Sequence, residues 1–426
     1  MEGVLNPAQR AAVLHGDGPL LILAGAGSGK TRVLTHRIAH LIGERGVSPD
    51  AILAITFTNK AAGEMRERIH RLVGPRARAI WASTFHSACV RILRRDSEAV
   101  GYARDFTIYD ADDQLRLIRK GFADEQLDPK RIAPRAVQAR IADAKSRLLD
   151  PEELAEEAGS FLDEQIARLY RRYADALRAN GAMDFDDLLM LAVRLLEGDA
   201  AVRERYQQRF QHVLVDEYQD TNHAQYRLVR VLGEPQRNVV VVGDDDQGIY
   251  SWRGADVRNI RDFGRDYPDA EIVALEQNYR STNTILRAAN AVVSNNPDRH
   301  AKNLWTDRGE GEPIQLVACR DEHEEARVVV SEVERSLGMG DSLSELAVFY
   351  RTNAQSRAVE DQLVRRGIAY QVIGGPKFYE RAEVRDLLAY RRAAANPNDS
   401  VSLGRMLGAP KRGIGPGTMA KLSGFA

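Results

Sequence analysis

The chain contains very little cysteine. Cys89 and Cys319 are the only two among 426 residues, and they lie far apart in the sequence. This excludes a disulfide-stapled secreted fold and predicts two reduced, buried thiols. The sequence also has no basic, apolar leader after Met1 and no apolar run long enough to span a membrane. We therefore expect a soluble protein of the cytoplasm.

The chain has no excess of either charge. Sixty Lys and Arg residues stand against 61 Asp and Glu residues, which gives a formal net charge of −1. A surface for nucleic acid must therefore be a local patch, and its affinity must depend on base stacking as well as on charge. The composition, 44% hydrophobic and 28% charged, is that of an ordinary globular protein. The length predicts roughly three domains.

A glycine-rich stretch lies between an apolar run at 20–23 and a helix-like segment at 32–42. It consists of Ala24, Gly25, Ala26, Gly27, Ser28, Gly29, Lys30 and Thr31. Strand, glycine turn and helix are the context of a phosphate-binding loop, whose backbone N–H groups and helix N-terminus hold phosphates. Lys30 is placed to reach the β- and γ-phosphates, and Thr31 to ligate Mg²⁺. Ala24 stands where the strictest motif has glycine, and the loop alone predicts only a nucleoside triphosphate.

Two further apolar stretches, 51–57 and 79–84, predict buried parallel strands, with a helix at 61–73 between them. The residues at their carboxyl ends are Phe57, Thr58, Asn59, Phe85 and His86. Ligands gather at the carboxyl ends of strands in open α/β sheets, and aromatic rings there suit stacking on single-stranded bases. Taken singly, Phe57 and Phe85 would each be assigned to core packing. His86 has no metal-ligand spacing around it.

Helical periodicity replaces the strand pattern between about 89 and 190, which predicts a helical insertion. One helical face is expected to carry Ile166, Leu169, Tyr170, Tyr173 and Leu177. Near its end, Met183-Asp-Phe185-Asp-Asp combines an aromatic residue with an acidic helix start and is uninformative alone.

A buried strand returns at 212–215 and ends in two carboxylates, Asp216 and Glu217. A phosphate loop requires such an acidic partner. Asp216 is expected to hold Mg²⁺, and Glu217 to orient and deprotonate the attacking water. These two adjacent residues can take different roles, because successive side chains of a strand point in opposite directions.

Three more clusters of polar and aromatic residues point to the same site. After the strand 238–243 come Gln247, Tyr250, Trp252 and Arg253. Further on, Tyr279 and Arg280 suit an adenine stacker beside a γ-phosphate clamp. In the first helix, which Asn6 caps, the Gln9 amide matches the N6/N7 edge of adenine, although a surface glutamine is the alternative.

A second α/β pattern begins past about 280. We expect strands at 313–318, 346–350 and 369–373, helices at 322–337 and 354–367, a boundary at 374–376 and a helix at 380–395. This lobe has no phosphate loop of its own. The basic, glycine-rich tail at 410–418 suits a backbone grip on a DNA phosphate, with a plain loop as the alternative.

The ordered set of motifs resembles the superfamily 1A DNA helicases of the UvrD, PcrA and Rep type. The motifs are LNPAQ, AGAGSGKT, ITFTNKAAGEM, STFHS, MDFDDLL, VLVDEYQDTN, VVGDDDQGIYSWRGA, LEQNYRS and FYRTNAQSR. Together they cover nearly the whole chain and are far more specific than a lone glycine loop.

The resemblance implies an ATP- and Mg²⁺-dependent motor that moves 3′ to 5′ on single-stranded DNA in repair or replication, in the cytoplasm and at the nucleoid. It assigns Gln9, Arg32 and Tyr279 to adenine, and Gln247 and Arg280 to the γ-phosphate. It assigns to DNA the residues Phe57, Thr58, Asn59, Phe85, His86, Phe185, Tyr250, Trp252, Arg253, Arg351, Arg412, Gly413 and Gly415. Implied partners are single-stranded DNA and single–double-strand junctions.

The resemblance also implies the fold class, which is α/β. A P-loop (RecA-like) parallel-sheet lobe is expected at 1–88 and 191–276, with a helical insertion at 89–190. An incomplete second RecA-like lobe follows at 277–377, and the start of a second helical insertion at 378–426. Arg412 to Thr418 resembles the duplex-contacting turn of that insertion.

The sequence departs from the family pattern at its C-terminus, where the late motifs and their arginine finger do not follow. We therefore expect an N-terminal fragment whose missing half could be a separate chain. Two alternatives remain: a module that binds ATP and single-stranded DNA with little turnover, and the motor of a helicase–nuclease subunit.

Overall fold

The computed structural model of the chain describes residues 5–297, 299–373, 381–415, 417–418 and 421. It divides into two compact units. The first comprises Met1–Gly311 and Leu387–Ala426, and the second comprises Glu312–Asp386. Among the described residues, no helix combines the length and apolar composition that a membrane span requires.

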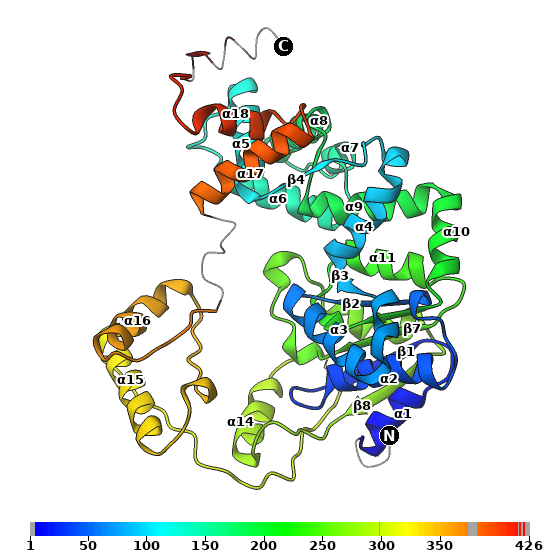
Figure 1. Cartoon of the computed structure of the whole chain (residues 1–426), viewed down its shortest axis with the longest axis vertical. Coiled ribbons are helices and arrows are strands. Elements are labelled where there is room, and N and C mark those ends of the chain that lie inside the picture. The colour runs from blue at the N-terminus through cyan, green and yellow to red at the C-terminus, as the bar shows by residue number, and fades with distance from the viewer. Residues whose placement is uncertain (1–4, 298, 374–380, 416, 419–420, 422–426) are drawn as a thin grey trace. The chain divides into compact units, whose positions relative to one another are not determined.

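A six-stranded parallel sheet forms the centre of the first unit (Figure 1). Its spatial order is β3-β2-β6-β7-β1-β8. The strands are β1 (Leu20–Ala24), β2 (Ile52–Thr56), β3 (Trp81–Thr84), β6 (His212–Val215), β7 (Val239–Gly243) and β8 (Glu271–Leu275). The predicted strands at 20–23, 51–57, 79–84, 212–215 and 238–243 are confirmed, whereas the half-exposed edge strand β8 was not expected.

Both faces of this sheet are buried, as expected for parallel strands. Alternate residues enter two separate cores: Leu20 and Ile22 face one, and Leu21 and Leu23 face the other. Helices α1 (Pro7–Leu14), α2 (Lys30–Gly43) and α3 (Asn59–Val73) cover the first core. The second is covered by α4 (Phe85–Asp96), α9 (Phe185–Gly198), α10 (Ala200–Arg209), α11 (His223–Gly233), α12 (Arg258–Arg261) and α13 (Phe263–Asp266).

A helical subdomain interrupts this arrangement, as the periodicity predicted. It contains α5 (Ala111–Asp124), α6 (Pro134–Ser146), α7 (Pro151–Glu156), α8 (Phe161–Ala179) and a short parallel pair, β4 (Thr107–Tyr109) and β5 (Ala182–Asp184). The apolar face predicted on α8 is confirmed, since Ile166, Leu169, Tyr170, Tyr173 and Leu177 are all buried.

The chain returns to this subdomain near its C-terminus. The end of α17 (Ala382–Ala395) and α18 (Ser400–Gly408) lie against it (Figure 1). Asn396 donates to the Asn180 carbonyl at 2.8 Å, and Arg392 pairs with Asp113 at 3.0 Å. Polar contacts with the subdomain therefore hold this segment, and Val401 also packs against the apolar core of the subdomain.

The second unit contains α15 (Glu322–Gly338) and α16 (Ser356–Arg365), close to the predicted helices. The strands predicted at 313–318, 346–350 and 369–373 are wrong: the described residues of this unit form no strand ladder. Leu316 and Phe349 are almost fully exposed. An apolar segment becomes a strand only when its N–H and C=O groups find a neighbouring strand. The predicted boundary at 374–376 lies outside the described residues.

Candidate nucleotide site and nucleic-acid cavity

The predicted site residues follow strands whose carboxyl ends meet at one edge of the sheet. Leu23 of β1 is in register with Gly243 of β7, and Ala24 with Leu275 of β8. β6 pairs with β7 on the other side. The parallel ladder thus brings the phosphate loop, the Asp216–Glu217 pair and the loops after β7 and β8 together.

The phosphate loop has the backbone that its glycines predict. Gly27 and Gly29 have φ values of 70° and 94°, which side-chain-bearing residues rarely adopt. Ser28 Oγ donates to the Gly25 carbonyl at 2.7 Å and closes the turn. Lys30 then begins α2, so the loop ends at a helix N-terminus suited to phosphate.

The loop is covered by the segment that follows β8. A Cβ built on Gly25 would clash with a methyl carbon of Leu304. One built on Gly27 would lie 2.7 Å from both Asn278 Nδ2 and Arg280 Cβ. Asn278 also donates to the Ala26 carbonyl at 2.5 Å. The glycines therefore permit close approach of protein as well as of phosphate.

Gln9 and Tyr279, two of the three residues predicted for adenine, are linked through Asn6. Gln9 is 1% exposed, so the surface alternative is wrong. Its Nε2 donates to the Ser28 carbonyl at 2.8 Å, and its Oε1 accepts from Asn6 N at 3.1 Å. Asn6 Nδ2 in turn lies 2.9 Å from the Tyr279 hydroxyl. Arg32 is exposed in the first turn of α2.

Lys30 connects the loop to the predicted catalytic groups. Its Nζ lies 2.9 Å from Glu217 Oε2 and 3.3 Å from Gln247 Oε1. Glu217 has φ 53°, a strained value for a non-glycine residue that is common at functional sites. Gln219, which sequence reasoning missed, donates to Glu217 at 2.8 Å and accepts from Asp244 N at 3.0 Å. Gln219 lies within the motif VLVDEYQDTN, and that position in the motif could have indicated it.

Asp216 has the environment of a metal ligand. Burial, and then the charge of Glu217, raise its pKa to about 7. No ion pair joins it to a cationic side chain within the part of the chain that the structure describes. A buried carboxylate with these properties, next in the chain to Glu217 and so near Lys30, fits Mg²⁺, which prefers hard oxygen ligands.

Most of the residues predicted to stack on bases line one cavity of about 610 Å³. Its predicted members are Phe57, Phe85, His86, Phe185, Tyr250, Trp252 and Arg253. They come from the turn after β2, from α4 and α9, and from the turn after β7, which are distant in sequence. The sequence alone did not place them in one cavity.

The rings of this cavity, the aromatic cavity, differ in how far they are exposed to solvent. Phe57 stacks on Tyr250 with centroids 5.1 Å apart, and Tyr250 lies 6.4 Å from Trp252. The Arg253 guanidinium lies 4.6 Å from the Trp252 centroid. Trp252 and Phe185 are exposed, whereas Phe85 is buried in the core and forms a wall. Packing, the alternative for Phe85, accounts for its position.

The other residues predicted to contact DNA lie outside this cavity. Thr58 caps α3 by accepting from Ala61 N, and Asn59 begins that helix. Arg351 is exposed in the second unit. Arg412 donates to the Met406 carbonyl at 2.7 Å and lies over the Tyr390 ring, so its guanidinium holds α17 and α18 together. Gly413 and Gly415 lie beside it, and Gly413 has φ 70°.

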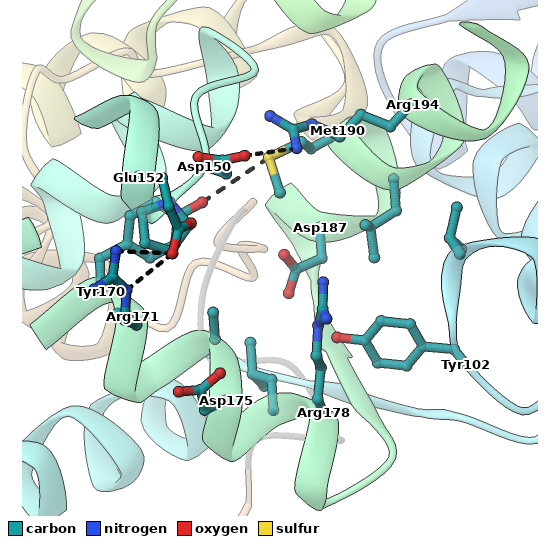
Figure 2. A pocket seen from close by; sticks show the side chains of 15 residues that line it. Tyr102, Asp150, Glu152, Tyr170, Arg171, Asp175, Arg178, Asp187, Met190 and Arg194 are labelled. Carbon is teal, nitrogen blue, oxygen red and sulfur yellow. Dashed lines mark hydrogen bonds and ion pairs between the residues drawn. The ribbon is translucent and has the colours of Figure 1, made fainter. Parts of the chain in front are cut away.

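A second cavity, of about 330 Å³, lies in the helical subdomain and contains none of the predicted site residues. Figure 2 shows its charged side chains, several of which pair with one another. Arg194 pairs with Asp150 at 3.0 Å, and Arg171 with Glu152 at 2.8 Å. These pairings give the cavity a structural explanation without a ligand.

Comparison with known proteins gives two family matches. The model of the UvrD/REP helicase N-terminal domain matches residues 5–268, and that of the UvrD-like helicase C-terminal domain matches residues 273–425. The latter match covers the region expected to be an incomplete second lobe, so that expectation is not confirmed.

Individual relatives are similar along almost the whole chain. The ATP-dependent DNA helicase PcrA of Bacillus subtilis is 50% identical over 423 residues, which cover 99% of this chain and 57% of that protein. PcrA of Staphylococcus epidermidis is 50% identical over 422 residues, which cover 99% and 58%. This chain therefore spans somewhat more than half the length of these relatives. The matches support neither the fragment expectation nor the two alternative functions.

Proposed function

This chain belongs to the UvrD/REP helicase family, and we propose that it acts as an ATP-dependent 3′–5′ translocase and helicase on single-stranded DNA. Its proposed substrates are ATP with Mg²⁺ and single strands or single–double-strand junctions, in DNA repair or replication. The polarity follows from the family resemblance. The nucleotide and DNA chemistry is supported by the side-chain arrangement.

ATP is proposed to bind at the carboxyl edge of the sheet. Lys30 would contact the β- and γ-phosphates, and Tyr279 would stack on adenine beside Gln9. Gln247 and Arg280 would sense the γ-phosphate. The contact of Lys30 with both Glu217 and Gln247 supports this assignment, because one γ-phosphate near Lys30 would touch all three groups.

Thr31 and Asp216 would hold Mg²⁺, which supplies Lewis-acid stabilisation of charge on the phosphate oxygens. Glu217 would accept the proton of the attacking water. Its contact with Gln219 fixes the carboxylate on the side of the loop after β7.

The observation that carries the proposal is the continuity between the two sites. Gln247 lies at the nucleotide loop, and Tyr250, Trp252 and Arg253 follow it directly into the aromatic cavity. A change in Gln247 when the γ-phosphate leaves would therefore move rings proposed to hold bases. Such a connection is what ATP-driven movement along a strand requires.

ATP hydrolysis by the full chain tests the proposal. We expect single-stranded DNA to stimulate hydrolysis strongly, and Lys30→Ala to lower it at least about a hundred-fold, since a preorganised charge on phosphate is lost. Phosphate release with and without oligonucleotide measures both. Lys130→Ala, at an exposed site between α5 and α6, is the control. Hydrolysis that ignores DNA, or that survives Lys30→Ala, would contradict the proposal.

Trp252→Ala is expected to weaken binding of a single-stranded oligonucleotide by about 1–3 kcal/mol, the contribution of stacking one base on an aromatic ring. Fluorescence anisotropy of a labelled oligonucleotide measures this change. Phe161→Ala is the matched control, because Phe161 is 68% exposed and Trp252 66%, yet only Trp252 lines the aromatic cavity. An equal effect of both changes would argue against a base-stacking cavity.

A further inference from the structure

Three carboxylates follow β7 and lie close to one another, next to Gln247 of the candidate nucleotide site. Asp244, Asp245 and Asp246 place oxygen atoms within 4.8 Å of one another, as the ligands of a metal ion would be. Their side chains are almost completely buried. Buried like charges at this spacing need a compensating cation.

The ammonium group of Lys302 is the cation that contacts all three carboxylates. Its Nζ lies 2.7 Å from Asp244 Oδ1 and 3.3 Å from Asp246 Oδ2, and it also pairs with Asp245. The Lys302 side chain is 3% exposed. Burial opposes its charge, but the bonds to Asp244 and Asp245 raise its pKa above the ordinary value. Lys302 therefore occupies the position that a metal ion would take.

Asp244 connects this cluster to two predicted catalytic groups, the carboxamide of Gln247 and the carboxylate of Glu217. Its Oδ2 accepts from Gln247 Nε2 at 2.6 Å, and Gln247 Oε1 accepts from Lys30. Its backbone N–H donates to Gln219, which donates to Glu217. A change in the position or charge of the Asp244 carboxylate would therefore act first on Gln247, which donates to it directly.

Two further residues of the cluster hold the same segment. Arg299 donates to both oxygens of Asp246 at 3.1 and 2.7 Å, and His300 N donates to Asp245 at 2.7 Å. Two residues after Lys302, Leu304 covers Gly25 of the phosphate loop. The segment 299–304 thus contacts the phosphate loop and the Gln247 loop together.

We propose that Lys302 is a positioning residue that fixes Gln247 for recognition of the γ-phosphate, acting through Asp244. This inference rests on the proposed function, because it presumes that ATP binds at Lys30. Without the ammonium group the carboxylates must separate or take up a proton. Either change removes Asp244 as a fixed acceptor for the Gln247 amide.

Discrimination between ATP and ADP tests the inference in the full chain. Dissociation constants are measured for a fluorescent non-hydrolysable ATP analogue and for fluorescent ADP. For Lys302→Met we expect the ratio of the ADP to the ATP-analogue constant to fall about ten-fold, the effect of one charge-assisted hydrogen bond. ADP affinity is expected to stay within about two-fold of wild type, because Gln247 faces only the γ-phosphate in the proposed site. Lys302→Arg, which keeps the charge, should restore much of the ratio.

Two further variants separate positioning from folding. Lys302→Met/Asp245→Asn removes one charge of each sign, so its remaining carboxylates repel one another less than those of Lys302→Met. If Lys302→Met unfolds in a thermal melt, the ratio of dissociation constants is measured on this double variant instead. In a Gln247→Leu background, Lys302→Met should have no further effect on the ratio. Arg194→Met, which also removes a cation from two carboxylates, should leave both constants unchanged.

An unchanged ratio in a folded variant would overturn the inference. Equal losses of ATP-analogue and ADP affinity would do the same, because Lys302 would then support only the loop as a whole. If the wild-type chain binds neither nucleotide, the proposed function fails instead, and the two failures are thereby distinguished.

Discussion

Glu217→Gln is expected to lower ATP turnover by about 10²–10⁴-fold, the usual contribution of a general base. Glutamine keeps the size of the side chain but cannot accept the proton of the attacking water. ATP binding should persist or strengthen, because a negative charge 2.9 Å from the Lys30 ammonium is removed. Lys30 then has one acidic competitor fewer for the phosphate.

Single-turnover hydrolysis and the dissociation constant of the ATP analogue separate these two effects. Glu234→Gln is the matched control, since Glu234 is an exposed glutamate at the end of α11. Turnover within ten-fold of wild type would exclude Glu217 as the base. A parallel loss of binding would indicate that the change disrupts the loop rather than the chemistry.

Lys145→Met is expected to destabilise the chain by about 3–5 kcal/mol, the cost of removing one partner from a buried ion pair. The Lys145 side chain is 1% exposed, and its Nζ lies 2.7 Å from both Asp184 and Asp187. Burial disfavours its charge, but the two carboxylates reverse this and raise its pKa above the ordinary value. Methionine would leave both carboxylates in the interior without a cation.

Urea unfolding followed by circular dichroism measures the loss, and exposed Lys130→Met should stay within about 0.5 kcal/mol of wild type. Asp184 also caps α9, whose first residue is Phe185 of the aromatic cavity. Oligonucleotide affinity is therefore expected to fall together with stability. A folded variant with a loss below about 1 kcal/mol would contradict a charged Lys145 in the interior.

Much of the first unit could be predicted because its signals are local. Apolar runs give the central strands, and the glycine loop fixes the turn into α2. Asn6 and Asp184 act as caps where the sequence suggested helix starts. The motifs indicated which strand ends carry the site residues. The parallel pairing of the strands places those ends side by side.

What the sequence could not provide depends on contacts between distant residues. Strands β4 and β5 have three residues each and pair across the whole helical subdomain. The apolar stretches of the second unit have a strand pattern but no partner strand among the described residues. Lys302 is a lone lysine in sequence, and only the fold shows that three carboxylates surround it.

Arg412 shows a further limit of sequence reasoning. A basic, glycine-rich turn suggested a contact with a DNA phosphate, yet Arg412 donates to a helix-end carbonyl and lies over an aromatic ring. The residue type was compatible with both roles. The sequence does not reveal the intramolecular partners of Arg412, and its contact with DNA stays a prediction.

The packing against the phosphate loop changes how glycine variants there can be interpreted. Gly25 and Gly27 are each in contact with side chains from 278–304, so an added methyl group would press on Leu304 or Asn278. A Gly25→Ala variant therefore reports two losses at once, one in the geometry of the phosphate loop and one in the packing of Leu304 against it. Trimming Leu304 to alanine beside Gly25→Ala would relieve the second loss alone. Activity recovered by that pair would measure how much of the loop's glycine requirement comes from the protein itself.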